Sequence, residues 1–175
     1  VATIGVFDGV HKGHQKLITR AVGESRKLGC RSIILTFRNN PKTYRLINNS
    51  SRRTSLLTTF DQRLELFAQL GVDYVVALDF NEQLSSMKPE EFAVNILKAK
   101  LSVKKCIIGY DFRFGKNKTG DFLTLKKIFP NNIIRIKPLK IRDEIVSSTA
   151  IKQLLKNNDI NKANKFLGHE FCFEG

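Results

Sequence analysis

The chain has 175 residues, of which 42% are hydrophobic, so it can enclose a core and is not a disordered chain. Its 30 lysine and arginine residues exceed its 16 aspartate and glutamate residues, and the formal net charge of +14 favours anionic partners such as nucleotides or nucleic acid. The basic residues are spread along the whole chain without interleaved aromatic residues, which argues against a nucleic-acid-binding surface.

No apolar run is long enough to span a bilayer and no signal peptide is recognised, so we expect no membrane partner and no secretion. The three cysteines, Cys30, Cys106 and Cys172, lack the spacing of a disulfide framework or a metal site. This usage is typical of a cytoplasmic protein with free thiols. Val1 stands directly at the start of an apolar run, so we expect further residues ahead of it.

Five short apolar runs predict buried strands, at residues 2–7, 31–37, 72–78, 104–109 and 132–136. Helical patterns lie at residues 13–27, 60–70, 89–101, 122–129, 150–156 and 160–167. Residues 80–88 and 110–121 are expected to be loops, and residues 38–58 a long functional or mobile one. This alternation predicts one α/β domain over residues 1–175, with a Rossmann-like, doubly wound parallel sheet of about five strands. Ligands of such sheets bind at the carboxyl ends of the strands.

The stretch Ile-Gly-Val-Phe-Asp-Gly-Val-His-Lys-Gly-His over residues 4–14 places two histidines where the first strand passes into the first helix. This junction offers free backbone N–H groups at the positive end of a helix dipole, and Gly13 lets a ligand approach the backbone. His11 and His14 share a face, can donate N–H groups to a phosphate, and are not expected in the core. The alternatives are a plain Asp-Gly turn, or a metal site with His169 as a third ligand.

Two further motifs follow predicted strands or precede a late helix. Residues 109–116, Gly-Tyr-Asp-Phe-Arg-Phe-Gly-Lys, combine aromatic rings that can stack on a flat ligand with Asp111, which can accept hydrogen bonds. Phe112 and Phe114 can alternatively be core residues. Residues 146–152, Val-Ser-Ser-Thr-Ala-Ile-Lys, place hydroxyl groups at a helix start, where they cap the helix or bind phosphate. Because these motifs should meet at one edge of the sheet, they predict a single site.

The pattern Gly-x-Phe-Asp-Gly-x-His-x-Gly-His resembles the signature of the HxGH nucleotidylyltransferases. Together with the Gly-x-Asp-Phe-x-Phe-Gly and Ser-Ser-Thr motifs and with Leu-Thr-Thr at residues 57–59, the chain is similar to the FMN adenylyltransferase module of prokaryotic bifunctional riboflavin kinase/FMN adenylyltransferases over nearly its whole length. The resemblance implies the nucleotidylyltransferase fold and FAD synthesis by transfer of AMP from ATP to the phosphate of FMN, with release of pyrophosphate. It also implies that Mg²⁺ accompanies ATP.

The resemblance assigns site residues by motif position. His11 and His14 are expected to be catalytic, and no protein residue is assigned to a metal. The residues expected to bind ATP are Phe7, Asp8, Gly9, Gly13, Asp111, Ser147, Ser148, Thr149 and Lys152. The residues expected to bind FMN are Phe37, Asn40, Thr59, Tyr110, Phe112 and Phe114.

Two positions depart from the family pattern. Lys152 stands where the family has an arginine, and Asn40 stands where it has the histidine of a Pro-His-Pro segment. Residues 158–171 resemble the segment that leads into the riboflavin kinase domain, so we expect that domain to be absent from this chain. The alternatives are an HxGH transferase acting on another phosphate monoester, and an inactive basic relative that binds nucleotides or nucleic acid. The sequence leaves the oligomeric state open.

Overall fold

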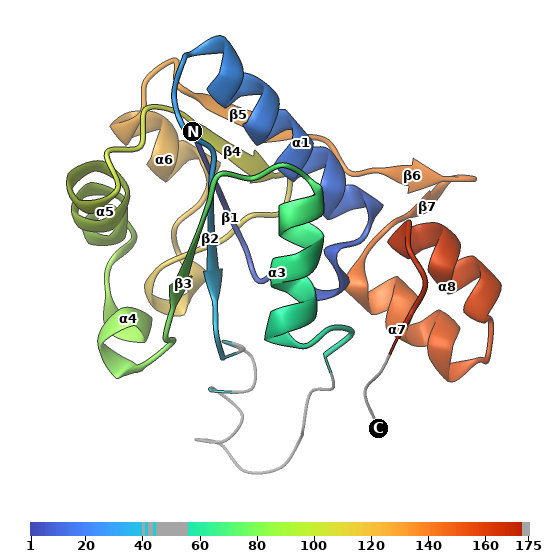
Figure 1. The fold of residues 1–175 in the computed structure, drawn as a ribbon. Coiled ribbons are helices and arrows are strands. Elements are labelled where there is room, and N and C mark those ends of the chain that lie inside the picture. Colours follow the sequence, from blue (N-terminus) through green and yellow to red (C-terminus); the bar gives the residue numbers. More distant parts are fainter. Residues whose placement is uncertain (40, 42–43, 45–55, 173–175) are drawn as a thin grey trace.

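The computed structural model of the chain describes residues 1–39, 41, 44 and 56–172 (Figure 1). Its centre is a parallel sheet of five strands in the order β3-β2-β1-β4-β5. The strands are β1 (Ala2–Ile4), β2 (Ile33–Phe37), β3 (Tyr74–Leu78), β4 (Cys106–Gly109) and β5 (Ile133–Ile136). The predicted α/β class, with a doubly wound sheet of five parallel strands, is confirmed. The chain leaves β1 in one direction and reaches β4 on its other side, so the switch point lies between β1 and β4.

Helices cover both faces of the sheet (Figure 1). One face carries α1 (Lys12–Lys27) and α3 (Phe60–Gln69), and the other carries α5 (Pro89–Glu91) and α6 (Phe122–Ile128). The chain continues from α5 as a π-helix over Phe92–Lys100. No helix among the described residues combines the length and hydropathy that crossing a bilayer requires.

The two faces of the sheet bury separate apolar clusters, as alternation along the strands requires. Toward α5 and α6 the cluster is built on Ala2, Ile4, Leu35, Ile108 and their partners from the helices. Toward α1 and α3 it includes Phe7, Val10, Ile18, Ile34 and Phe67. The central strands are thus held from both sides, which fixes the ends of β1, β2 and β4 relative to one another.

The last part of the chain forms a smaller helical pair beside the sheet. Helices α7 (Ser148–Lys156) and α8 (Ile160–Leu167) pack on each other and on the hairpin of β6 (Lys140–Ile141) and β7 (Glu144–Ile145) (Figure 1). Their shared apolar cluster is separate from the clusters of the sheet, and it includes Ile151, Ala163, Phe166 and Leu167. We call this unit the α7–α8 pair.

Several sequence expectations need correction. Residues 80–88 are not only a loop, because α4 (Glu82–Ser86) forms there with Asn81 as its N-cap. The first strand ends at Ile4 and not at residue 7, because Phe7 has a φ of 54° and leaves the extended conformation. The β6–β7 hairpin was not predicted, since its two turn residues adopt positive φ without a glycine. Most of the predicted loop 38–58 lies outside the described residues.

Thr3 in β1 gives a direct test of the buried sheet. Its side chain is fully buried between Ile34 of β2 and Ile107 of β4, and among the described residues its hydroxyl has no hydrogen-bond partner. Because an unsatisfied buried hydroxyl is destabilising, Thr3→Val is expected to raise the free energy of unfolding by about 1 kcal/mol. Urea unfolding of the two proteins measures this, and a loss of stability would contradict the expectation.

Candidate active site

The turn between β1 and α1 is fixed by contacts with the segment before α3. The carboxylate of Asp8 accepts a hydrogen bond from the backbone N–H of Leu57 at 2.7 Å, and the N–H of Gly9 donates to Thr58 Oγ1 at 2.9 Å. Gly9 has a φ of 78°, and a Cβ there would lie 2.8 Å from Leu57 Cδ1, so only glycine fits without strain. These contacts place the start of α1 at the switch point of the sheet.

The two histidines pack against each other at the start of α1. His11 is the N-cap, and its Nδ1 accepts a hydrogen bond from the backbone N–H of His14 at 3.3 Å. The rings stack with centroids 3.6 Å apart, and the His14 ring meets the edge of Phe7 at 5.3 Å. The expectation that neither lies in the core is wrong for His11, which is only 5% exposed, because its ring packs flat against the ring of His14.

Burial keeps both imidazoles neutral. It lowers the pKa of His11 to about 4, although the nearby carboxylate of Asp8 opposes the shift. It also lowers the pKa of His14 well below the usual value, with the neighbouring His11 adding to the effect. Because Nδ1 of His11 accepts a hydrogen bond, the neutral ring carries its hydrogen on Nε2. At neutral pH the pair therefore offers hydrogen-bond donors and not fixed positive charge.

These shifts predict how stability depends on pH. Below pH 6.5 the unfolded chain binds a proton that folded His11 does not accept until the pH approaches 4, so the free energy of unfolding should fall in that window. The loss from His11 amounts to about 3 kcal/mol, and His14 adds to it in the same direction. Urea unfolding at a series of pH values measures the slope. His11→Asn should flatten it, whereas an identical slope in that variant would contradict the assignment.

A polar cavity of about 240 Å³ opens beside the histidines. It lies between the start of α1, the end of β4 and the start of α7, where Ser147 caps the helix by accepting from the N–H of Ala150 at 3.2 Å. Two helix N-termini thus face one cavity, an arrangement that suits phosphate groups. Both predicted catalytic residues, His11 and His14, line it. The predicted ATP-binding residues that line it are Gly13, Asp111, Ser147, Ser148 and Thr149.

The other predicted ATP residues are not among the lining residues of the polar cavity. Lys152 Nζ forms an ion pair with Asp8 Oδ2 at 2.6 Å, and Ser148 Oγ donates to the backbone carbonyl of Asp8 at 2.9 Å. Phe7 packs in the core, and Gly9 serves the turn. Lys152 and Ser148 thus join the α7–α8 pair to the turn that carries the histidines.

A second, mainly apolar cavity of about 410 Å³ lies on the other side of Asp111. Its walls come from β1, β2 and the loop after β4, with further side chains from Phe80, Leu84 and Phe92 that the sequence reasoning did not single out. The predicted FMN residues that line it are Phe37, Phe112 and Phe114. Asp111 lines both cavities, so the two meet at this residue.

The remaining predicted FMN residues lie elsewhere. Tyr110 lines the polar cavity and not the apolar one. Thr59 is the N-cap of α3, where it forms a reciprocal capping box with Gln62, and it lines neither cavity. Asn40 lies outside the described residues. The predicted FMN residues that the structure brings together are therefore Phe37 of β2 with Phe112 and Phe114 of the loop after β4.

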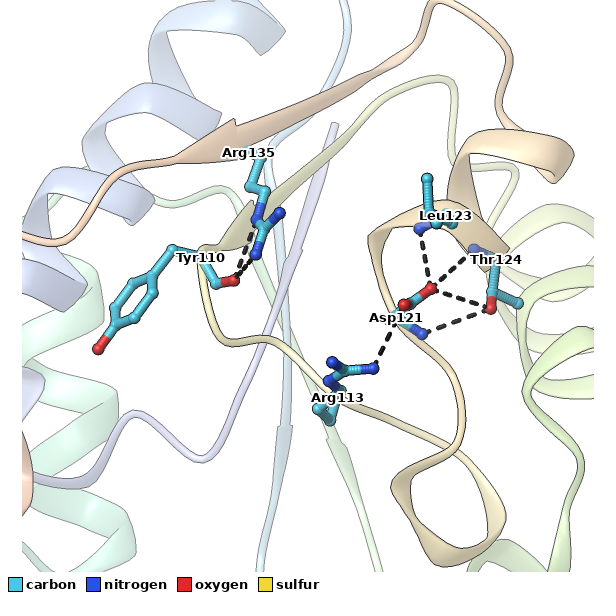
Figure 2. Close-up of polar contacts among 6 residues, drawn as sticks. All are labelled: Tyr110, Arg113, Asp121, Leu123, Thr124 and Arg135. Carbon is cyan, nitrogen blue, oxygen red and sulfur yellow. Dashed lines mark hydrogen bonds and ion pairs between the residues drawn. The ribbon is translucent and has the colours of Figure 1, made fainter.

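Two arginines anchor the loop between residues 110 and 121 (Figure 2). Arg135 of β5 donates from Nε to the backbone carbonyl of Tyr110 at 3.0 Å, with a second contact from its terminal nitrogen. Arg113 pairs with Asp121 at 3.2 Å, and Asp121 caps α6 by accepting from the N–H of Thr124. The sequence reasoning missed both anchors, because each depends on a partner that only the folded chain brings near.

The fold and the site together define a class of protein. A doubly wound sheet with Gly-x-Phe-Asp-Gly-x-His-x-Gly-His at its switch point is an α/β protein of the nucleotidylyltransferase fold. Residues 1–150 match the model of the FAD synthetase family, and the chain belongs to that family.

The sequences of curated relatives support this family membership. The chain is 36% identical over 177 residues to a bifunctional riboflavin kinase/FMN adenylyltransferase from Buchnera aphidicola subsp. Schizaphis graminum, covering 99% of the chain and 56% of that protein. It is 33% identical over 178 residues to the enzyme of the same name from Escherichia coli K12, covering 100% of the chain and 56% of that protein. The chain thus spans about half the length of these relatives.

A solved structure supports the fold. The crystal structure of a Streptococcus pneumoniae protein that is named a macrolide-efflux protein superposes with a TM-score of 0.84 at 28% identity. The superposition covers 97% of this chain and 65% of that one.

Proposed function

We propose that residues 1–175 form an FMN adenylyltransferase domain, which transfers AMP from ATP to the phosphate of FMN and so makes FAD and pyrophosphate. The observation that carries the proposal is the meeting of two unlike cavities at Asp111. The polar cavity, with two histidines and two helix N-termini, suits a triphosphate. The apolar cavity, with the rings of Phe37, Phe112 and Phe114, suits a flavin ring. Membership of the FAD synthetase family supports the same reaction.

In this reaction an oxygen of the FMN phosphate attacks the α-phosphorus of ATP, and the bond between that phosphorus and the bridging oxygen of pyrophosphate breaks. The attacking phosphate is already an anion, so no general base is required. The enzyme contributes alignment and stabilisation of developing negative charge. We assign the charge stabilisation to the neutral N–H groups of His11 and His14, and to the backbone N–H groups at the starts of α1 and α7.

We assign roles to the other predicted residues from their places around the two cavities and in the turn before α1. Ser147, Ser148 and Thr149 would hold the outer phosphates, and Tyr110 would lie beside the nucleotide. Phe7, Asp8, Gly9 and Lys152 would act on ATP indirectly, by holding the turn. Asn40 and Thr59 stay assigned to the FMN side through the family motif alone.

Mg²⁺ belongs to the proposal as a companion of ATP. Among the described residues no three His, Cys, Asp or Glu side chains gather into a cation site, and a magnesium ion held mainly by phosphates and water needs none. When bound, the ion would neutralise charge on the leaving pyrophosphate. We also propose a cytoplasmic location, in keeping with the free thiols of Cys30, Cys106 and Cys172.

The proposal is tested by incubating the protein with FMN, ATP and Mg²⁺ and separating the flavins by chromatography. We expect FAD to appear together with an equal amount of pyrophosphate. If FMN is unchanged and the protein instead binds oligonucleotides with a steep salt dependence, a basic binding protein without catalysis is the better description.

A further inference from the structure

We infer that Arg63 of α3 is a positioning residue that fixes one wall of the apolar cavity and thereby sets the affinity for the flavin substrate. The inference rests on the proposed function for the identity of that ligand. Arg63 is 2% exposed, although it carries a charge at neutral pH. A buried guanidinium is rare unless its N–H groups are hydrogen-bonded, so the acceptors of Arg63 indicate which segments it connects.

The guanidinium donates to oxygens on three separate segments. Its terminal nitrogens reach the carbonyl of Val6 at 2.6 Å, Thr36 Oγ1 at 3.3 Å and the carbonyl of Phe37 at 3.2 Å. Its Nε donates to the carbonyl of Thr59 at 3.4 Å, at the start of its own helix. One side chain thus connects the chain leaving β1, the end of β2 and the start of α3.

Two of these acceptors belong to the wall of the apolar cavity. Val6 and Phe37 both line it, and their carbonyl groups are the ones that the guanidinium holds. None of the four acceptor residues lines the polar cavity. Loss of the guanidinium should therefore disturb the binding of FMN more than the binding of ATP.

The partners of Arg63 among the described residues are carbonyl and hydroxyl oxygens, and no carboxylate pairs with it directly. Burial lowers the pKa of Arg63, and the more distant carboxylate of Asp8 partly opposes this shift. Its ring neighbour is Phe60, whose centroid lies 5.3 Å from the guanidinium carbon. A planar group with five donors can satisfy three segments at once, whereas a lysine ammonium donates from a single atom.

The test uses three variants of the whole chain. Arg63→Lys keeps the charge and removes the fork, and Thr36→Val removes one acceptor while preserving the shape of a buried side chain. Arg31→Lys is the matched control, because Arg31 precedes the other end of β2 and makes an exposed ion pair with Asp73 at 3.1 Å. Flavin fluorescence gives the Kd for FMN, steady-state kinetics gives KM for FMN and ATP, and amide hydrogen exchange reports on residues 5–9 and 36–39.

Arg63→Lys should raise the Kd and KM for FMN by about tenfold, the change expected when hydrogen bonds from a charged donor are lost, and leave the KM for ATP within about twofold. Thr36→Val should show a smaller shift of the same kind, and Arg31→Lys none. Exchange at residues 5–9 and 36–39 should accelerate in Arg63→Lys.

A role in stability alone would lower the amount of active enzyme without changing either KM, and that result would overturn the inference. So would unchanged hydrogen exchange at both segments. If the parent protein binds no FMN and makes no FAD while exchange still accelerates in Arg63→Lys, the proposed function fails and Arg63 remains the residue that holds these strand ends. The outcomes of the two proposals are thus distinguishable.

Discussion

Alanine at His11 or His14 is expected to lower the turnover of FAD formation by about 10²–10³-fold, the range seen when one donor to a developing oxyanion is removed. The reason is that both rings are neutral and line the polar cavity, so each would contribute an N–H group where charge builds on the phosphates. The KM for FMN should change little, because neither ring lines the apolar cavity. Initial rates at saturating ATP measure the effect.

The two histidines need different controls. Alanine at position 11 also removes the N-cap of α1, so His11→Asn, which retains a capping oxygen, separates loss of catalysis from loss of the helix start. Turnover should stay low in His11→Asn while its thermal unfolding midpoint exceeds that of His11→Ala. Parental turnover in either alanine variant would remove that histidine from the assigned role.

Gly115→Ala is expected to lower the free energy of unfolding by about 2–4 kcal/mol, because alanine is strained at a positive φ and its Cβ would overpack the neighbouring residues. Gly115 has a φ of 71°, and a Cβ there would lie 2.8 Å from the backbone nitrogen and Cα of Pro89. Because these are backbone atoms at the start of α5, they cannot move away from the new Cβ as the end of a flexible side chain could. Because Gly115 also lines the apolar cavity next to Phe114, the affinity for FMN should fall as well.

Gly23→Ala is the matched control for this substitution. Gly23 lies inside α1, and a Cβ there would meet no atom within 4 Å. Alanine favours a helix over glycine, so this variant should gain up to about 1 kcal/mol. Urea unfolding of both variants tests the pair, and a loss in Gly23→Ala as large as that in Gly115→Ala would contradict the steric argument.

Hydrophobic periodicity was enough to predict the sheet and most of its helices. The five apolar runs contain the five parallel strands, because helices cover both faces of such a sheet and its strands are therefore mainly apolar. Periodicity could not predict α4 or the β6–β7 hairpin, which are short and bury little. The turn at Arg142 and Asp143 has positive φ at both residues without the glycine that usually signals it.

The arrangement of the candidate site was predictable where the place of a residue follows from its own position in the chain, and not where it depends on a distant partner. His11, His14 and the Ser147–Thr149 segment lie where strand and helix order demand, and all line the polar cavity. Lys152 was expected to face phosphate, but here it pairs with Asp8. Arg63 had no visible role in the sequence, since its acceptors on β1 and β2 meet it only after folding.

Partial unfolding of the chain would affect the two cavities differently. The polar cavity takes one wall from the start of the α7–α8 pair. The apolar cluster of that pair is separate from those of the sheet but includes Leu57, and its polar contacts with the rest of the chain include the Lys152–Asp8 ion pair and the hydrogen bond that Gln15 of α1 donates to the carbonyl of Leu167. The apolar cavity takes no residue from that pair. Such a pair can open as a cooperative unit before the sheet does. In mild denaturant, the proposed binding of ATP would therefore be lost while the apolar cavity is still folded.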